Sequence, residues 1–313
     1  MTGQTLAELG EHALIYLIQG SLGESDYVLI GSGDDAAHVA TADGTYLVST
    51  DLLIEGQHFR KDWSSAEDIG RKAVAVNLSD INAMGGVATA LTVGLAAPGD
   101  TPVAWIRELL AGMIAECAKV GAKIVGGDLS SAETIILSIT AMGDAERPVS
   151  RAGASAGDVV AVVGELGMAG AGFGALSRGF RSPKAAVDRH RVPEPPYAEG
   201  PQAAEAGATA LIDVSDGLLA DLGHIARASN VAIDLASEAF EIPEAVQTVA
   251  SALGGVDPLQ VVLSGGDDYA LVGTFPVGAV PAGGRTIGAV TAGEGVTVDG
   301  QPFEGVQGHT HWG

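Results

Sequence analysis

Residues 211–219 read LIDVSDGLL, an apolar run that ends in acidic side chains and leads into a second apolar segment. The composition of 211–214 predicts a buried strand, and the spacing of apolar residues in 216–228 predicts an amphipathic helix. A strand followed at once by a helix is the repeating unit of mixed α/β architecture. The two aspartates lie at the junction, where side chains of several such units can meet.

Four further segments show an apolar run followed by small residues and then aspartate. They are LIGSGDDAA (29–37), YLVSTDLL (46–53), IVGGDLSS (124–131) and VVLSGGDDYAL (261–271). A single aspartate at a strand end is most often a helix cap or a turn residue. Five such junctions favour one shared site, because converging carboxylates repel by about 1 kcal/mol or more per close pair unless a cation lies among them. Mg²⁺, which prefers oxygen ligands and links carboxylates to substrate phosphates, fits that pattern.

Hydrophobic periodicity predicts the remaining elements. Strands are expected at 27–30, 45–49, 90–95, 123–125, 135–141, 159–163, 211–214, 270–274 and 286–290. Helices are expected at 5–19, 65–84, 102–120, 168–178, 216–228 and 243–252. The stretch 147–157, RPVSRAGASAG, is a joint rich in small residues, so we predict domains at 1–147 and 148–313. We also predict that the proline-rich segment 182–201 is an ordered surface loop.

Composition excludes several classes of partner. The 313 residues contain 16 Lys and Arg against 39 Asp and Glu, a formal charge of −23, so neither nucleic acid nor an anionic membrane is an expected partner. The single cysteine, Cys117, excludes an internal disulfide and predicts a cytoplasmic protein. The first 21 residues lack the basic segment of a signal peptide, and no apolar run is long enough to span a bilayer.

Seven blocks taken in order resemble the thiamine-monophosphate kinase family. They are GDDAA, STDLLIEGQHF, KAVAVNLSDINAMGG, GGDLSS, SRAGASAGD, DVSDGLLADLGHIA and SGGDDYAL, and the resemblance extends from residue 31 to 312. It implies a two-domain PurM-like fold of mixed α/β class (α+β), with an N-terminal sheet domain that pairs in a homodimer and a C-terminal α/β sandwich. It also implies phosphorylation of thiamine monophosphate by ATP, the final step of thiamine diphosphate synthesis, with several Mg²⁺ ions.

The same resemblance assigns roles by position. The implied metal ligands are Asp35, Ser49, Thr50, Asp51, Asp80, Asp128, Asp213 and Asp216. The implied ATP contacts are Gly127, Asp128, Arg151 and Ser215, and the implied substrate contacts are His58, Asp267 and Trp312. No catalytic residue beyond the metal ligands is implied. Asp216 is also placed to cap the helix that follows it.

These assignments predict direct in-line transfer, in which positioning and electrostatics lower the barrier and no covalent phosphoenzyme forms. Two alternatives remain at this level. One is another ATP-dependent enzyme of the same superfamily, similar to aminoimidazole ribonucleotide synthetase. The other is a protein that binds Mg²⁺ and nucleotide without catalysis.

Overall fold

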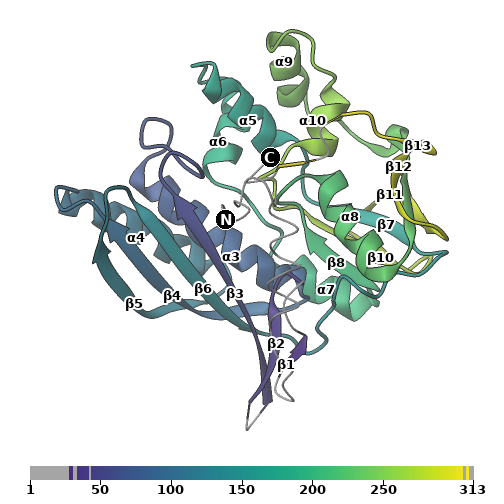
Figure 1. Cartoon of the computed structure of the whole chain (residues 1–313), viewed down its shortest axis with the longest axis horizontal. Coiled ribbons are helices and arrows are strands. Elements are labelled where there is room, and N and C mark those ends of the chain that lie inside the picture. Colours follow the sequence, from purple (N-terminus) through teal and green to yellow (C-terminus); the bar gives the residue numbers. More distant parts are fainter. Residues whose placement is uncertain (1–27, 31–33, 42–43, 306–307, 310–313) are drawn as a thin grey trace, which may run out of the picture.

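The computed structural model describes residues 28–30, 34–41, 44–305 and 308–309. Within them the strands form a six-stranded sheet of order β1-β2-β3-β6-β4-β5 and a seven-stranded sheet of order β13-β12-β9-β11-β7-β10-β8. The two sheets occupy opposite halves of the molecule, with helices between and beside them (Figure 1). The mixed α/β class predicted from the sequence is confirmed.

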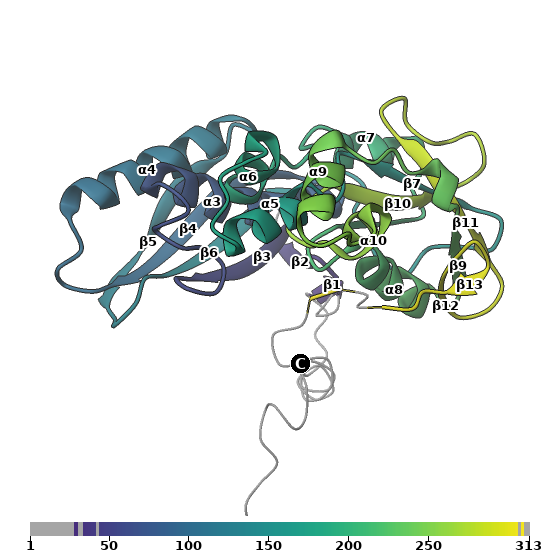
Figure 2. The same cartoon turned by 90° about the horizontal axis from the view of Figure 1, so that it is seen from above.

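The first sheet is antiparallel except at one pair of strands, β4 and β5, which run parallel. Its strands are β1 (Val28–Ile30), β2 (Ala37–Thr41), β3 (Gly44–Ile54), β4 (Val87–Ala97), β5 (Lys123–Ser131) and β6 (Ile136–Asp144). Helices α3 (Ala66–Ala83) and α4 (Val103–Ala118) cover one of its faces (Figure 2). A Cβ at Gly70 would lie 2.0 Å from the Leu109 carbonyl oxygen, so only glycine permits this close contact between the two helices.

Helix α3 contacts elements of both halves of the molecule. Ser65 and Asp68 form a capping box at its start, which satisfies two backbone N–H groups that have no partner inside the helix. Its buried side chains include apolar Ile69 and Ile81, and also four polar ones, Lys72, Asn77, Ser79 and Asn82. Buried polar groups require partners, and those of α3 come from strands of both halves, from the loop at Asp267 and from the helix at 199–206.

The second half surrounds the seven-stranded sheet. Its strands are β7 (Val159–Val163), β8 (Ala210–Asp213), β9 (Ala232–Leu235), β10 (Leu271–Phe275), β11 (Arg285–Thr291), β12 (Gly295–Val298) and β13 (Gln301–Pro302). Its helices are α5 (Met168–Ser177), α6 (Lys184–Arg191), α7 (Glu199–Ala206), α8 (Leu218–Ser229), η1 (Ser237–Ala239), α9 (Glu244–Ala252) and α10 (Pro258–Ser264). The larger core forms against α5, α8, α9 and α10, and a smaller core on the other face contacts α7.

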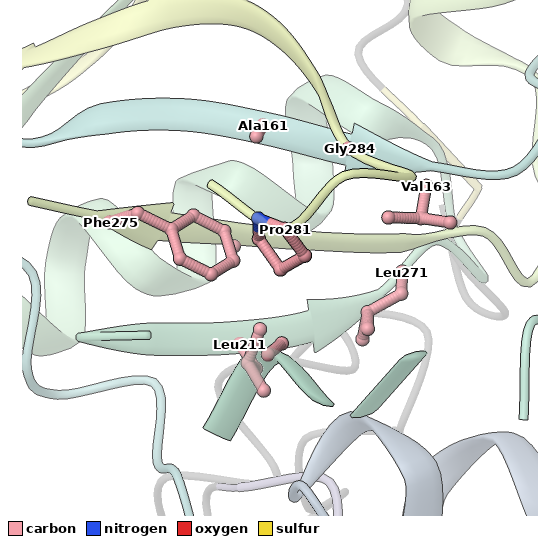
Figure 3. Close-up of a pocket in the computed structure, with 9 residues that line it drawn as sticks. Ala161, Val163, Leu211, Leu271, Phe275, Pro281 and Gly284 are labelled. Carbon is pink, nitrogen blue, oxygen red and sulfur yellow. The ribbon is translucent and has the colours of Figure 1, made fainter. Parts of the chain in front are cut away.

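A small cavity lies in that smaller core. Figure 3 shows Leu211, Leu271, Phe275 and Pro281 around it, and all of its lining is apolar. Its volume is about 10 Å³, which is at the lower limit of the space that one water molecule needs. We interpret it as a packing gap and not as a ligand site.

Several predictions about the elements are wrong. The segment 182–201, predicted as a loop, contains α6 and the start of α7. The apolar run 261–264, grouped with the strand-end junctions, is the last part of α10 and not a strand. Strands β3 and β5 continue past residues 49 and 125, so Asp51 and Asp128 lie inside strands and not at their ends. Strands β2, β9, β12 and β13 were not predicted. The predicted helix 5–19 lies outside the described residues.

The predicted domain boundary between 147 and 148 falls between β6 and β7 and stays a prediction. Among the helices in the described part of the chain, none has the length and apolar character needed to cross a membrane.

Candidate active site

Aspartates from both halves of the molecule converge beside α3. Carboxylate oxygens of Asp35, Asp80 and Asp213 lie within 4.8 Å of one another, and Asp51 is close enough to Asp80 for each carboxyl group to shift the pKa of the other. Asp51 comes from β3, Asp80 from α3 and Asp213 from the end of β8, while Asp35 precedes β2. We call these four residues the aspartate cluster. Residues separated by up to 178 positions (213 − 35) thus share one buried site.

Hydroxyl and amide groups hold the cluster in place. The Ser49 hydroxyl donates to Asp80 Oδ2 at 2.6 Å, and the Ser79 hydroxyl donates to Asp213 Oδ2 at 2.6 Å. The backbone N–H of Asp51 donates to Asn77 Oδ1 at 3.1 Å. Because side chains of a strand alternate between faces, Thr50 points away from the cluster, and its hydroxyl pairs instead with that of Thr140 at 2.8 Å. Only the backbone of Thr50 is therefore available to an ion in the cluster.

The carboxylates of the cluster are electrostatically unfavourable without a cation. Burial, then the charges of Asp51, Asp213 and Asp35, raise the pKa of Asp80 well above its usual value. Burial and the charge of Asp35 likewise raise the pKa of Asp213. Buried carboxylate and hydroxyl oxygens are ligands that fit Mg²⁺, and the charge of the ion would reverse the pKa shifts of Asp80 and Asp213.

Metal-free protein is therefore expected to lose stability as pH rises. A carboxyl group whose pKa is raised on folding binds more protons in the folded state than in the unfolded state, so the free energy of unfolding falls as pH rises above the unfolded value near 4. Asp34, raised to about 6 by burial and by Asp35, and Asp268, raised to about 7 by burial, contribute in the same direction. Thermal melts in EDTA between about pH 5 and pH 8 should show a falling Tm, and Mg²⁺ should raise the Tm more at pH 8. An equal Mg²⁺ shift at both pH values would contradict this.

Arg151 joins the cluster from the segment that connects the halves. Its Nη2 lies 2.8 Å from Asp35 Oδ1 and its Nε lies 3.1 Å from Asp35 Oδ2, a two-point contact with a carboxylate. Its backbone N–H donates to Asp34 Oδ1 at 2.9 Å. The guanidinium predicted to contact ATP is thus placed at the aspartate cluster, and 17% of its side chain remains exposed.

Asp216 belongs to a second group of potential ligands, together with Asp221 and His224, whose ligand atoms lie within 4.8 Å of one another. The prediction that Asp216 caps the following helix is wrong. Helix α8 begins after Gly217, and the N–H groups of Asp216 and Gly217 donate to Asp221 Oδ2 at 3.2 and 3.0 Å. The carbonyl of Ser215 accepts from the N–H of Asp267 at 2.8 Å and so brings two predicted site residues together.

Gly127 and Asp128 lie apart from the cluster. They are exposed on β5, and β6 and β4 separate β5 from β3. Three strand spacings amount to about 14 Å, which is more than two carboxylates can bridge through one ion. Within one chain, Asp128 therefore cannot share an ion with Asp51.

The predicted substrate residues have different surroundings. The backbone N–H of Ile54 donates to His58 Nδ1 at 3.0 Å, so the neutral ring of His58 carries its proton on Nε2. Asp267 Oδ2 lies 2.7 Å from the ammonium group of Lys72. Trp312 lies outside the described residues.

Sequence reasoning missed the residues that line the space beside Asp267. The rings of Trp63, Phe173 and His190 contact each other with centroids 5.6 to 6.0 Å apart, and His190 Nδ1 lies 3.8 Å from Asp267 Oδ2. Lys72 could have been noticed, because it opens the apolar block KAVAV in a helix predicted to be buried. Nothing in the sequence indicates that Trp63 meets residues more than 100 positions away.

Comparison with known proteins gives full-length matches. Residues 33–145 match the family described as AIR synthase related protein, N-terminal domain, and residues 155–273 match AIR synthase related protein, C-terminal domain. Thiamine-monophosphate kinase of Mycobacterium tuberculosis is 50% identical over 312 residues, which cover 99% of this chain and 93% of that protein.

Solved structures agree with this. One described as AaThiL complexed with AMPPCP and TMP is 35% identical, covers 99% of this chain and 100% of its own, and superposes with a TM-score of 0.92. Thiamine monophosphate kinase from Aquifex aeolicus is 34% identical, with coverage of 96% and 100% and a TM-score of 0.86. Because sequence identity and fold both match along the whole length, the chain belongs to the thiamine-monophosphate kinase family.

Proposed function

We propose that the chain transfers the γ-phosphoryl group of ATP to thiamine monophosphate and so forms thiamine diphosphate. The observation that carries this proposal is the buried aspartate cluster, found in a fold that matches a relative described as complexed with AMPPCP and TMP. Two anionic substrates repel each other, and a highly acidic protein could bind both only with metal ions present. The activity of the relatives therefore agrees with the chemistry of this site.

Several Mg²⁺ ions would be held by the aspartate cluster with Ser49 and the backbone of Thr50, and by Asp216 and Asp128 nearer the nucleotide. Bound there, Mg²⁺ would supply positive charge to the transferring phosphoryl group. The protein's own groups would position the two substrates. Arg151, Ser215 and Gly127 would contact ATP, and His58 Nε2–H would donate to the phosphate of thiamine monophosphate. No general base is required, because a phosphate monoester is already ionised near neutral pH.

Asp267 would face the organic part of the substrate. Its side chain is 37% exposed and lies beside the ring of His190, against which the rings of Trp63 and Phe173 pack. Aromatic rings and a carboxylate suit a planar heterocycle that carries an amino group or a positive charge. We assign Trp312 to the same pocket from the family resemblance alone.

The test is product formation by the purified chain. With ATP, Mg²⁺ and thiamine monophosphate, thiamine diphosphate and ADP should appear in equal amounts, and both should be absent in EDTA. Formation of ADP with formylglycinamidine ribonucleotide, and not with thiamine monophosphate, would favour the synthetase alternative. Nucleotide binding without any ADP formation would favour a non-catalytic protein.

A homodimer and a cytoplasmic location complete the proposal. The helices α3 and α4 cover one face of the first sheet (Figure 2), and the exposed apolar side chains of Leu52 on β3 and Val87 on β4 lie on the other face. Exposed apolar side chains that gather on one sheet are typical of an interface. A second copy on this sheet would also explain Asp128, because a partner can supply that carboxylate to an ion that the same chain cannot reach.

Leu52→Asp is expected to convert the dimer to a monomer. Residue 52 is 53% exposed on β3, with its side chain on the opposite face from Asp51 and Leu53, and a charge there would be buried without a partner on dimerisation. Light scattering coupled to size exclusion measures the mass directly. Val277→Asp, at a residue 79% exposed in the other half, is the matched control and should leave the mass unchanged. A monomeric unmodified protein would contradict the homodimer.

A further inference from the structure

Lys72 is a buried lysine between the two halves of the molecule. It lies on α3, 5% of its side chain is exposed, and its ammonium group lies 2.7 Å from Asp267 Oδ2 and 3.5 Å from the carbonyl oxygen of His190. Removing an ammonium group from water is costly, so a lysine is buried only where a partner compensates its charge. By contrast, Lys184 pairs with Asp188 on the surface, where 84% of its side chain is exposed.

The contacts of Lys72 fix the orientation of Asp267. The backbone of Asp267 is in the left-handed region, with φ of 64°, and its N–H donates to Ser215. Lys72 engages Oδ2, and Oδ1 is left with a long contact of 3.4 Å from the Tyr269 hydroxyl. Oδ1 is therefore the atom with unused hydrogen-bonding capacity on a carboxylate that is partly open to solvent.

Lys72 also gives Asp267 an electrostatic environment that differs from that of the aspartate cluster. Burial would raise the pKa of Asp267, but the charge and hydrogen bond of Lys72, together with His190 and the Tyr269 hydroxyl, outweigh burial and hold that pKa below its usual value. Asp80 and Asp213 in the cluster show the opposite shift. Tyr269 lies within the field of both groups, since burial and then the charges of Asp267 and Asp51 raise its pKa. Asp267 is thus neutralised by a cation built into the protein, although it lies near carboxylates that need a metal.

His190 is the third member of this group. Its Nδ1 is buried, lies 3.8 Å from Asp267 Oδ2 and has no hydrogen-bond partner. Burial and the charge of Lys72 lower the pKa of His190 to about 4, so the ring is neutral at pH 7. A neutral ring does not replace Lys72 as the counter-ion of Asp267.

We propose that Lys72 is a positioning residue for the organic substrate, which holds Asp267 so that Oδ1 accepts a hydrogen bond from a cationic or amino-bearing heterocycle. By occupying Oδ2, Lys72 also prevents Asp267 from becoming another Mg²⁺ ligand. The inference rests on the proposed function, because it identifies that heterocycle with thiamine monophosphate. It assigns the selection of this substrate to a residue that contacts neither the phosphates nor the metal ligands.

Steady-state kinetics of Lys72→Met, Lys72→Arg and the control Lys184→Met test the proposal. Lys72→Met should raise the KM for thiamine monophosphate by about 10- to 100-fold, the loss expected for a charged hydrogen bond, with kcat and the KM for ATP within about twofold. Lys72→Arg, which keeps the charge, should recover part of the loss. Lys184→Met should behave as the unmodified protein.

A double-mutant cycle with Asp267→Asn separates positioning from general stability. If Lys72 acts through Asp267, adding Lys72→Met to Asp267→Asn raises the KM for thiamine monophosphate little further. The proposal would be overturned if the KM increases of the two single variants multiply in the double variant. It would also be overturned if Lys72→Met raised the KM values for thiamine monophosphate and for ATP equally. If Lys72→Met does not fold, as judged by thermal melts, the same cycle with Lys72→Arg decides. An unmodified protein that forms no thiamine diphosphate would overturn the proposed function instead, and calorimetric binding of thiamine monophosphate with AMPPCP and Mg²⁺ would then decide the role of Lys72.

Discussion

Asp213→Asn is expected to lower kcat by at least about a hundred- to a thousandfold and, in the same protein without metal, to raise the Tm. Asparagine keeps an oxygen that can accept from the Ser79 hydroxyl, so the local hydrogen bond survives. The change removes one of three carboxylates whose oxygens lie within 4.8 Å of one another, and repulsion in the folded state falls. It also removes a ligand charge that the phosphoryl transfer requires.

The opposite signs of these two effects make the experiment informative. Replacing a purely structural carboxylate would lower stability and activity together, whereas replacing a carboxylate kept for function raises stability and lowers activity. Initial rates with saturating ATP and Mg²⁺ measure the first effect, and melts in EDTA measure the second. Asp100→Asn, at an exposed aspartate in a turn, is the matched control and should change neither. Full activity of Asp213→Asn would refute the assignment of this residue to the metal site.

Arg151→Gln is expected to lower the free energy of unfolding of the metal-free protein by about 3 kcal/mol, the usual cost of removing one partner from a buried ion pair. The Asp35 carboxylate is 1% exposed and would be left with an uncompensated charge among other carboxylates. Urea unfolding measures the loss, and Mg²⁺ should reverse part of it because an ion can replace the guanidinium charge.

Two variants control for this result. In Arg151→Gln with Asp35→Asn, most of the lost stability should return, because the unpaired charge is gone. Arg60→Gln breaks an exposed pair with Asp62 and should leave the urea midpoint essentially unchanged. If Arg151→Gln matches Arg60→Gln in stability, the ion pair with Asp35 does not hold the two halves together. A rise in the KM for ATP of Arg151→Gln would separately support its proposed contact with nucleotide.

Much of the site was predictable because its motifs are local. The segment LIDVSDGLL forms β8 followed by α8, as predicted, and the seven blocks identified the family correctly. Asp35, Asp51, Asp80 and Asp213 could be named together because the resemblance to one family carries over the positions of its implied metal ligands. The repulsion argument predicted that the five strand-end junctions share one site. The structure brings Asp35, Asp51 and Asp213 together with Asp80, and it places Asp216 in a second group and Asp128 three strands away.

Other features depend on contacts between distant segments. Strand β3 extends to Ile54 because β6 pairs with it along residues 47–54, and no local preference in STDLLIE shows that. The proline-rich segment 182–201 forms α6 because Ala186 and His190 pack against Gly172 of α5, where a Cβ would lie 2.1 Å from the Ala186 carbonyl oxygen. Tertiary packing therefore decided what composition suggested was a loop.

The sequence by itself determined the fold class, the family and the acidic residue types of the site, because apolar periodicity, motif order and charge are properties of neighbouring residues. Only the tertiary structure decided which carboxylates lie close together, which face of β3 Thr50 occupies, and that Lys72 pairs with Asp267 across 195 positions. The physical reason is that ion pairs and burial depend on which side chains lie close together in the folded chain, and these can be far apart in the sequence. A lysine in an apolar helix has no visible partner until the fold brings one to it.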